Sequence, residues 1–162
     1  MKKLFGIMAS AFAAVIALCL IGCSNEPSGA EQLEKYTSLP SVSDFQDRAS
    51  DLIIELTVYS DPEAPERYKA QEANKKLQDV CQAVIDEDDA PAQCEALHEC
   101  YTNAASMLQT AGTAYQSAAS LYSLGNFDKG MTQIELATTA CDSATDYLND
   151  AGSMIMAMQE EK

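Results

Sequence analysis

Residues 94–155 read CEALHECYTNAASMLQTAGTAYQSAASLYSLGNFDKGMTQIELATTACDSATDYLNDAGSMI, and this stretch decides the fold. Apolar side chains recur every seven residues on both sides of Gly125-Asn126, a spacing typical of long helices that pack as a coiled coil. The recurring positions are Cys94, Tyr101, Leu108, Tyr115 and Tyr122 before the pair, and Phe127, Ile134, Cys141, Leu148 and Ile155 after it. Glycine and asparagine both tolerate the left-handed conformation that ends a helix. The stretch therefore predicts an antiparallel helical hairpin that turns at residues 125–126.

Two more helices are predicted before this hairpin. The first has either Ser41 or Ser43 as its N-cap, and the second begins with Pro62 or Pro65, because proline suits the first turn of a helix. Their apolar residues are spaced three and four apart, as on one face of a helix. These residues are Val42, Phe45, Ala49, Leu52, Leu56 and Tyr59, and then Ala70, Ala73, Leu77, Val80 and Val84.

An acidic run over residues 86–89 separates the second helix from the third. Its carboxylates favour the positive end of the helix that we expect to open near Pro91. The run lacks the alternating ligands and the central glycine of an EF-hand, so it does not predict a calcium site. Nowhere do apolar and polar residues alternate as they would in a strand. The predicted fold is all-α: an antiparallel up-and-down four-helix bundle over residues 41–162, with a long C-terminal helical hairpin.

The first 22 residues have the layout of a signal peptide. Lys2 and Lys3 precede an almost unbroken apolar run over residues 4–21, and signal peptides have this positive start and hydrophobic centre. The run ends in LIGC at residues 20–23. This ending resembles the lipobox of bacterial lipoprotein precursors, in which an aliphatic residue stands three positions before the cysteine and a small residue stands directly before it.

The resemblance implies that residues 1–22 are removed as a signal peptide and that Cys23 receives diacylglycerol and fatty acyl chains such as palmitate. Two chains are enough for stable anchoring. Residues 23–40 are polar and contain two prolines, so they predict a lipidated flexible stalk. The expected location is the extracytoplasmic face of a cell membrane. The alternative is an uncleaved transmembrane helix, because about 18 apolar residues can just span a bilayer.

Charge restricts the partners of the remaining chain. Loss of residues 1–22 removes two lysines and no acidic residue, which leaves 8 basic and 25 acidic side chains and a formal net charge of −17. This sign excludes nucleic acid as a partner, because nucleic-acid binding depends on Lys and Arg. It also argues against a domain that lies flat on anionic lipid. The length of the chain after residue 40 suits one domain.

Four cysteines remain in addition to Cys23, and an extracytoplasmic location favours disulfides. In an antiparallel bundle, the distance of a residue from the turn gives its height along the axis. Cys81 and Cys94 then lie at nearly equal heights, so a Cys81–Cys94 bridge is predicted, with Cys81–Cys100 as its rival. Cys141 lies ~15 Å from Cys100 in height, beyond the ~7 Å that a disulfide allows between Cα atoms. Cys141 therefore stays a small core residue unless the helix breaks at Gly112.

Residues for catalysis are scarce. His98 is the only histidine, and although Glu95 and His98 have the E-x-x-H spacing of di-iron bundles, such a site needs two of these pairs. No phosphate-binding loop or dinucleotide fingerprint occurs. The sequence therefore predicts neither an enzyme nor a bound cofactor.

A soft-metal site is the alternative to a purely structural role. Met154 and Met158 share a helix face, and the height rule places this face near His98 and Cys94. Thioether, thiol and imidazole ligands suit Cu(I). The sequence thus leaves open a copper-binding lipoprotein that uses His98, Met154 and Met158.

Residues 122–137, YSLGNFDKGMTQIELA, resemble the middle of a tetratricopeptide repeat, although Gly130 stands where the repeat has alanine. No second copy occurs at a 34-residue period, so a repeat array is not predicted.

Together, the anchor, the heptads and the missing catalytic set predict a non-enzymatic interaction or structural module of the cell envelope. Its partner is expected to be another envelope protein, which the sequence does not identify.

Overall fold

The fold is seen in a computed structural model that describes residues 28–160. Over this range the chain forms five α-helices and two short 3-10 helices, without a strand, so the prediction of an all-helical domain is confirmed. The α-helices are α2 (Gly29–Thr37), α3 (Pro40–Tyr59), α4 (Ala70–Ile85), α5 (Glu95–Ser123) and α6 (Phe127–Glu160), and the 3-10 helices are η1 (Arg67–Lys69) and η2 (Ala92–Cys94).

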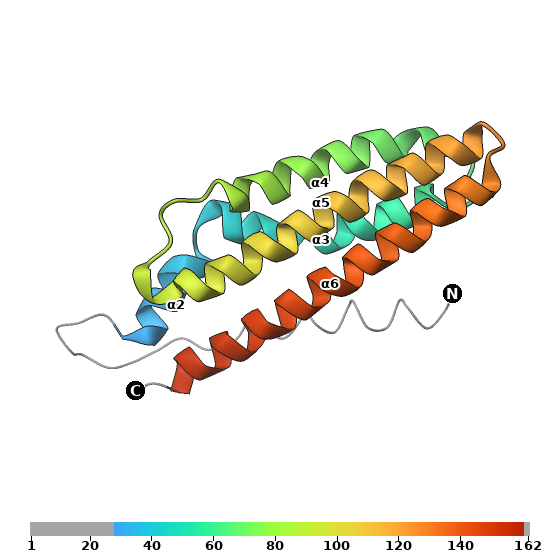
Figure 1. The fold of residues 1–162 in the computed structure, drawn as a ribbon. Helices are drawn as coiled ribbons and strands as arrows, with labels where there is room; N and C mark the ends of the chain where they lie inside the picture. The colour runs from blue at the N-terminus through green and yellow to red at the C-terminus, as the bar shows by residue number, and fades with distance from the viewer. Residues whose placement is uncertain (1–27, 161–162) are drawn as a thin grey trace.

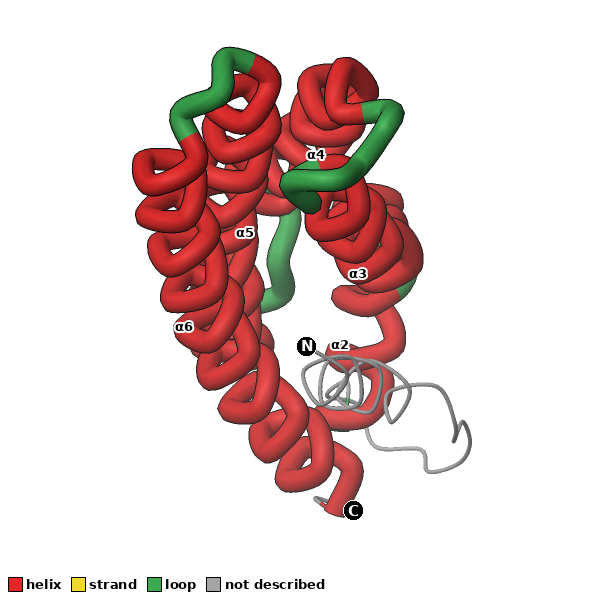
Figure 2. Tube along the Cα trace, turned by 90° about the vertical axis from the view of Figure 1, so that its right-hand side faces the viewer, coloured by secondary structure: helices red, strands yellow, loops and turns green. Residues whose placement is uncertain are grey.

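The four long helices, α3, α4, α5 and α6, extend lengthwise along the domain (Figure 1). α5 is the central helix, because it packs against α3, α4 and α6, whereas the α6 backbone does not come within 8 Å of that of α3 or α4. Figure 2 shows the α5–α6 pair beside the α3–α4 pair. Near its C-terminal end α6 also meets α2 (Figure 1). The side of α5 between α4 and α6 therefore has no helix over it among the described elements.

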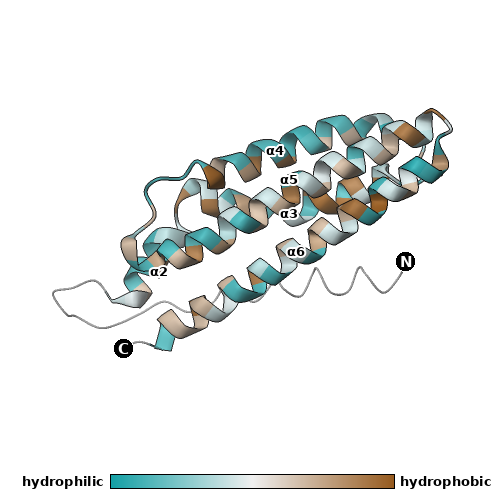
Figure 3. Cartoon of the chain, in the orientation of Figure 1, coloured by the Kyte–Doolittle hydropathy of each residue, from teal (hydrophilic) through white to brown (hydrophobic). Residues whose placement is uncertain are grey.

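Apolar side chains from all five α-helices form the buried core of the described domain. The outward side of α4 is mostly hydrophilic (Figure 3). Small residues line the α5–α6 seam, where Ala111, Ala118, Ala137 and Ala144 are all buried. Such residues let two helix backbones approach closely. Phe127, which the heptad pattern assigns to this seam, is instead 53% exposed.

Two glycines in the α5–α6 hairpin have identifiable roles. Gly125 has a φ of +75°, so it provides the left-handed turn that the sequence predicts. Gly130 lies against the ring of Tyr122, and a Cβ at this position would be only 2.3 Å from Tyr122 Cε1. This contact explains why glycine replaces the alanine of the repeat-like pattern.

The prediction that residues 23–40 form a flexible stalk is wrong for the part that the structure describes, because residues 29–37 form α2. Ser28 accepts a hydrogen bond from the Glu31 backbone, and the Glu31 side chain accepts one from the Ser28 backbone, which completes a capping box. Leu33 and Tyr36 are both buried in the core. Burial of the Leu33 and Tyr36 side chains and the capping box at Ser28 stabilise α2 despite the polar composition of the segment.

Other helix starts also differ from the predictions. α3 begins at Pro40, and its N-cap Leu39 makes no side-chain cap; the proline fixes the first turn instead. Ser41 donates a hydrogen bond to Glu87 in the α4–α5 link. α4 begins at Ala70, several residues after Pro65. The acidic run does not cap α5 through a side-chain hydrogen bond.

The predicted signal peptide and Cys23 lie outside the described residues. Within residues 28–160, none of the helices combines the length and the hydrophobicity that a membrane span requires.

Candidate functional site

Two residues singled out in the sequence, His98 and Cys94, lie where α2 packs against the bundle. Tyr36 of α2 is fully buried, and a 3.1 Å hydrogen bond joins its hydroxyl to His98 Nδ1 in the first turn of α5. The Tyr36 ring also lies 6.0 Å from the ring of Tyr101, centre to centre. Burial, reinforced by the neighbouring Tyr101, holds the pKa of Tyr36 well above its usual range. This junction is therefore a packed contact in which the Tyr36 hydroxyl keeps its proton.

The four cysteines of the described chain are buried free thiols. The predicted Cys81–Cys94 bridge is thus absent from the structure, and so is its rival with Cys100. The Cys94 thiol lies 3.5 Å from the Gln32 carbonyl oxygen of α2, an element that the sequence analysis did not anticipate. Burial raises the pKa of Cys81 to about 12 and that of Cys141 to about 11. Buried thiols with such pKa values are poor nucleophiles.

The structure gives no support to the copper alternative. Met154 and Met158 are half-buried and pack against the hydrophobic core. His98 and Cys94 make their hydrogen bonds with α2. Across residues 28–160, no group of three or more His, Cys, Asp or Glu side chains is placed to hold a metal. Methionines that fill the irregular end of a core need no metal to explain them.

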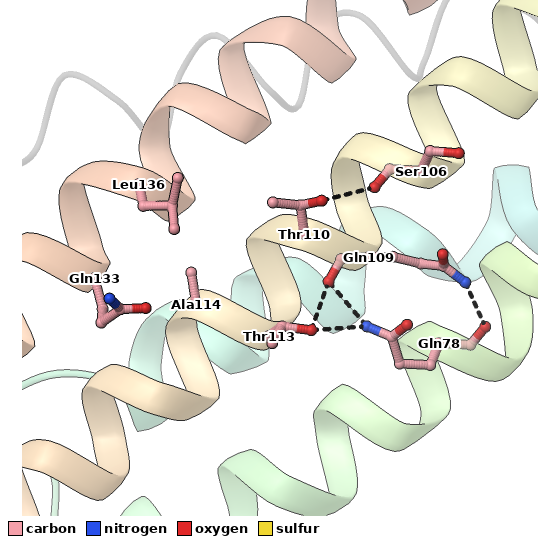
Figure 4. A pocket seen from close by; sticks show the side chains of 8 residues that line it. All are labelled: Gln78, Ser106, Gln109, Thr110, Thr113, Ala114, Gln133 and Leu136. Atoms are coloured by element: carbon pink, nitrogen blue, oxygen red, sulfur yellow. Dashed lines mark hydrogen bonds between the residues drawn. The ribbon is translucent and has the colours of Figure 1, made fainter.

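An open groove on α5, between α4 and α6, is the strongest candidate for a binding site (Figure 4). Its volume is about 310 Å³. Eight residues line it: Gln78 of α4; Ser106, Gln109, Thr110, Thr113 and Ala114 of α5; and Gln133 and Leu136 of α6. The lining contains no ionisable side chain, although 22% of the whole sequence is charged.

Side-chain hydrogen bonds fix the α4 wall of the groove. The Gln78 side-chain amide donates to the backbone carbonyl oxygen of Gln109 at 2.9 Å. The Gln109 side-chain amide donates back to the backbone carbonyl oxygen of Gln78 at 3.4 Å (Figure 4). One turn away, the Asn74 amide donates to Gln116 Oε1 at 2.6 Å. These reciprocal bonds hold α4 and α5 in one register.

Gly112 permits this close approach of α4. A Cβ at Gly112 would lie 2.5 Å from Asn74 Oδ1 and 2.7 Å from Leu77 Cδ2. α5 continues unbroken through this residue, so Gly112 does not mark the helix break that the sequence left open. Its absent side chain instead makes room for α4.

None of the eight groove residues was predicted as a site residue from the sequence. A signal for them was present, because no charged residue occurs from Cys100 to Phe127 in an otherwise acidic chain. The heptad pattern explained the apolar part of this stretch as a seam, and its Ser, Thr and Gln residues were left without a role.

Comparison with known proteins adds no relative, because neither a protein-family model, nor a curated protein, nor a solved structure matches this chain. The function must therefore be argued from the residues themselves.

Proposed function

We propose that this protein is a lipid-anchored lipoprotein on the extracytoplasmic face of a cell membrane, and that its domain is a non-enzymatic interaction or structural module of the envelope. The lipobox-like LIGC at residues 20–23 follows a positively charged and apolar leader, which supports the anchor. In this proposal, α3 to α6 form the antiparallel up-and-down bundle, and α2 connects that bundle to the lipidated cysteine.

The connection between the proposed anchor and the fold is short. Five backbone steps lead from Cys23 to Ser28, the N-cap of α2, and they span at most about 18 Å. A stalk that ended only at residue 40 would reach up to about 60 Å. Lipid on Cys23 would therefore hold the folded domain close to the membrane surface, with α2 as its first ordered element.

A non-enzymatic role agrees with the distribution of polar groups. The buried polar side chains of the described range are Ser60 and Asn74, so the core of that range contains no carboxylate. Catalytic carboxylates commonly have shifted pKa values that depend on such burial. His98 is hydrogen-bonded to Tyr36 through Nδ1. These features favour binding or support over catalysis.

Metabolic labelling tests the anchor. We expect a clickable palmitate analogue to label the wild-type protein in a bacterial host, and Cys23→Ala to abolish the label and leave an uncleaved precursor. Cys19→Ala is the matched control, because Cys19 lies four residues upstream in the same leader and should leave the label unchanged. Label retained by Cys23→Ala, or absent from the wild type, would overturn the proposal.

A further inference from the structure

We propose that the groove between α4 and α6 binds an uncharged ligand rich in hydroxyl groups, of the kind that a short glycan segment presents. The inference concerns the described domain alone and does not depend on the lipid anchor. It rests on the hydrogen-bonding capacity, the charge and the shape of the groove.

Apart from Gln133, the polar side chains that line the groove on α4 and α5 present acceptors, because their donors are already used within the protein. The Ser106, Thr110 and Thr113 hydroxyls each donate to the backbone carbonyl four residues earlier in α5. Each hydroxyl oxygen keeps its capacity to accept. A ligand that bonds to this row must therefore bring its own donors.

The two glutamines on the α4 side follow the same rule. The Gln78 amide nitrogen donates to Asn74 Oδ1, to the Gln109 backbone carbonyl and, at 3.4 Å, to the Thr113 hydroxyl, which therefore already accepts one hydrogen bond. The Gln109 amide nitrogen donates to the Gln78 backbone carbonyl and to Gln82 Oε1. Within residues 28–160, neither side-chain carbonyl oxygen accepts a hydrogen bond. Both oxygens add to the acceptors of the groove (Figure 4).

The charge of the lining selects among donor-rich ligands. An ammonium group loses much hydration when it is bound, and a partner carboxylate normally compensates for this loss. The groove lining offers no carboxylate. Sugar hydroxyls are neutral donors that need no such partner. An anionic ligand is disfavoured by the surrounding protein, because residues 28–160 contain 23 acidic and 7 basic side chains.

The shape also suits a segment of an extended chain. A volume of about 310 Å³ lies at the lower end of the range for small-molecule sites, about 300–1,000 Å³. Leu136 is 48% exposed at the α6 wall, and it offers an apolar surface to the C–H face of a sugar ring. Gln133 lies beside Leu136 (Figure 4), and its amide adds both donors and an acceptor.

Titration of the purified full chain in detergent, followed by NMR, tests the proposal. The probes are chitotetraose, which is neutral and rich in hydroxyls, spermine, which supplies cationic N–H donors, and an oligogalacturonate, which is an anionic sugar. We expect saturable shifts at Gln78, Gln109 and Gln133 with chitotetraose, and much weaker effects with the other two probes.

Two matched variants locate the binding. Thr110→Arg places a long side chain in the groove, and we expect it to weaken chitotetraose binding at least tenfold. Thr139→Arg is the control, because Thr139 is likewise an exposed helical threonine that donates to the carbonyl four residues earlier. The proposal is overturned by an absence of chitotetraose binding, by equal binding to both variants, or by a preference for spermine or the anionic sugar. None of these results would affect the palmitate label on Cys23.

Discussion

Replacement of Gly130 by alanine tests the packing of the α5–α6 hairpin. In an ordinary helix interior this change is stabilising by roughly 1 kcal/mol, because glycine has more conformational freedom to lose on folding. At Gly130 the new Cβ would lie 2.3 Å from Tyr122 Cε1, 2.6 Å from Cδ1 and 2.8 Å from Cζ. The Tyr122 ring is itself buried and packs against the Phe127 ring at a tilt of 31°, with centroids 5.8 Å apart, so it cannot move away without repacking the turn.

The size of the effect follows from these two opposing contributions. Added carbon atoms in a well-packed site typically cost about 1–3 kcal/mol. After the gain in helix propensity, we expect Gly130→Ala to lower the free energy of unfolding by as much as about 2 kcal/mol. Gly152→Ala is the matched control in the same helix, because a Cβ there would have no neighbour within 4 Å. The control should raise the free energy of unfolding by about 0.5–1 kcal/mol.

Urea and thermal unfolding followed by circular dichroism at 222 nm measure both variants. The two substitutions should shift the midpoint in opposite directions, by roughly 3–5 °C per kcal/mol for a domain of this size. The variant Tyr122→Leu completes a double-mutant cycle with Gly130→Ala, and the cost of the alanine should shrink when the ring is removed. The reasoning is refuted if Gly130→Ala stabilises as Gly152→Ala does, or if its cost is unchanged without the ring.

Three further predictions concern the α2 junction and the thiols. Tyr36→Phe should lower the free energy of unfolding by about 1 kcal/mol, because it removes the hydrogen bond to His98. Tyr36→Ala also removes the buried ring and should lower the free energy of unfolding by about 3–5 kcal/mol. Equal urea midpoints for the wild type and both variants would contradict the packing of α2. Iodoacetamide at pH 8 should leave Cys81 and Cys141 unmodified in the folded protein and alkylate them in urea, as read by mass spectrometry, whereas rapid alkylation of the native state would show that they are accessible. The pKa values of about 12 for Cys81 and about 11 for Cys141 exceed the ordinary thiol value of 9.0. Above about pH 9 the folded state therefore retains protons that the unfolded chain releases, and urea midpoints should fall as the pH rises. A midpoint that rises between pH 8 and pH 10 would refute this.

Local patterns in the sequence were enough to predict four of the five described helices. Heptad spacing marked α5 and α6, and Gly125-Asn126 correctly marked the turn between them. α2 was missed because the polar composition of its segment outweighed the capping box at Ser28 and Glu31. A short helix of this kind is stabilised mostly by the burial of Leu33 and Tyr36, and burial depends on residues far away in the chain.

The cysteines show where prediction from spacing fails. The pairing was predicted from the position of each cysteine along the bundle axis, and this position does not give the direction in which each thiol points. Cys94 points toward Gln32 of α2, and no pairing rule applied to the long helices alone could have included that contact. Disulfide formation requires both proximity and suitable Cβ directions, and the sequence addressed only proximity.

The candidate groove depended still more on tertiary structure. Its residues come from three helices, and Gln78 and Leu136 are separated by 58 positions in the chain. The sequence did record the missing charge along α5. It did not reveal that α4 and α6 would leave one side of this helix open.

The sequence by itself determined the helical class, the hairpin turn, the acidic charge and a leader that predicts lipid attachment, because each of these follows from residues close together in the chain. The tertiary structure alone decided that α2 docks onto the bundle, that the described thiols remain unpaired, and that an uncharged row of acceptors lines a groove. These features depend on which helix faces pack together. That choice depends on the fit of small residues such as Gly112 and Gly130 to their neighbours, which periodicity does not encode.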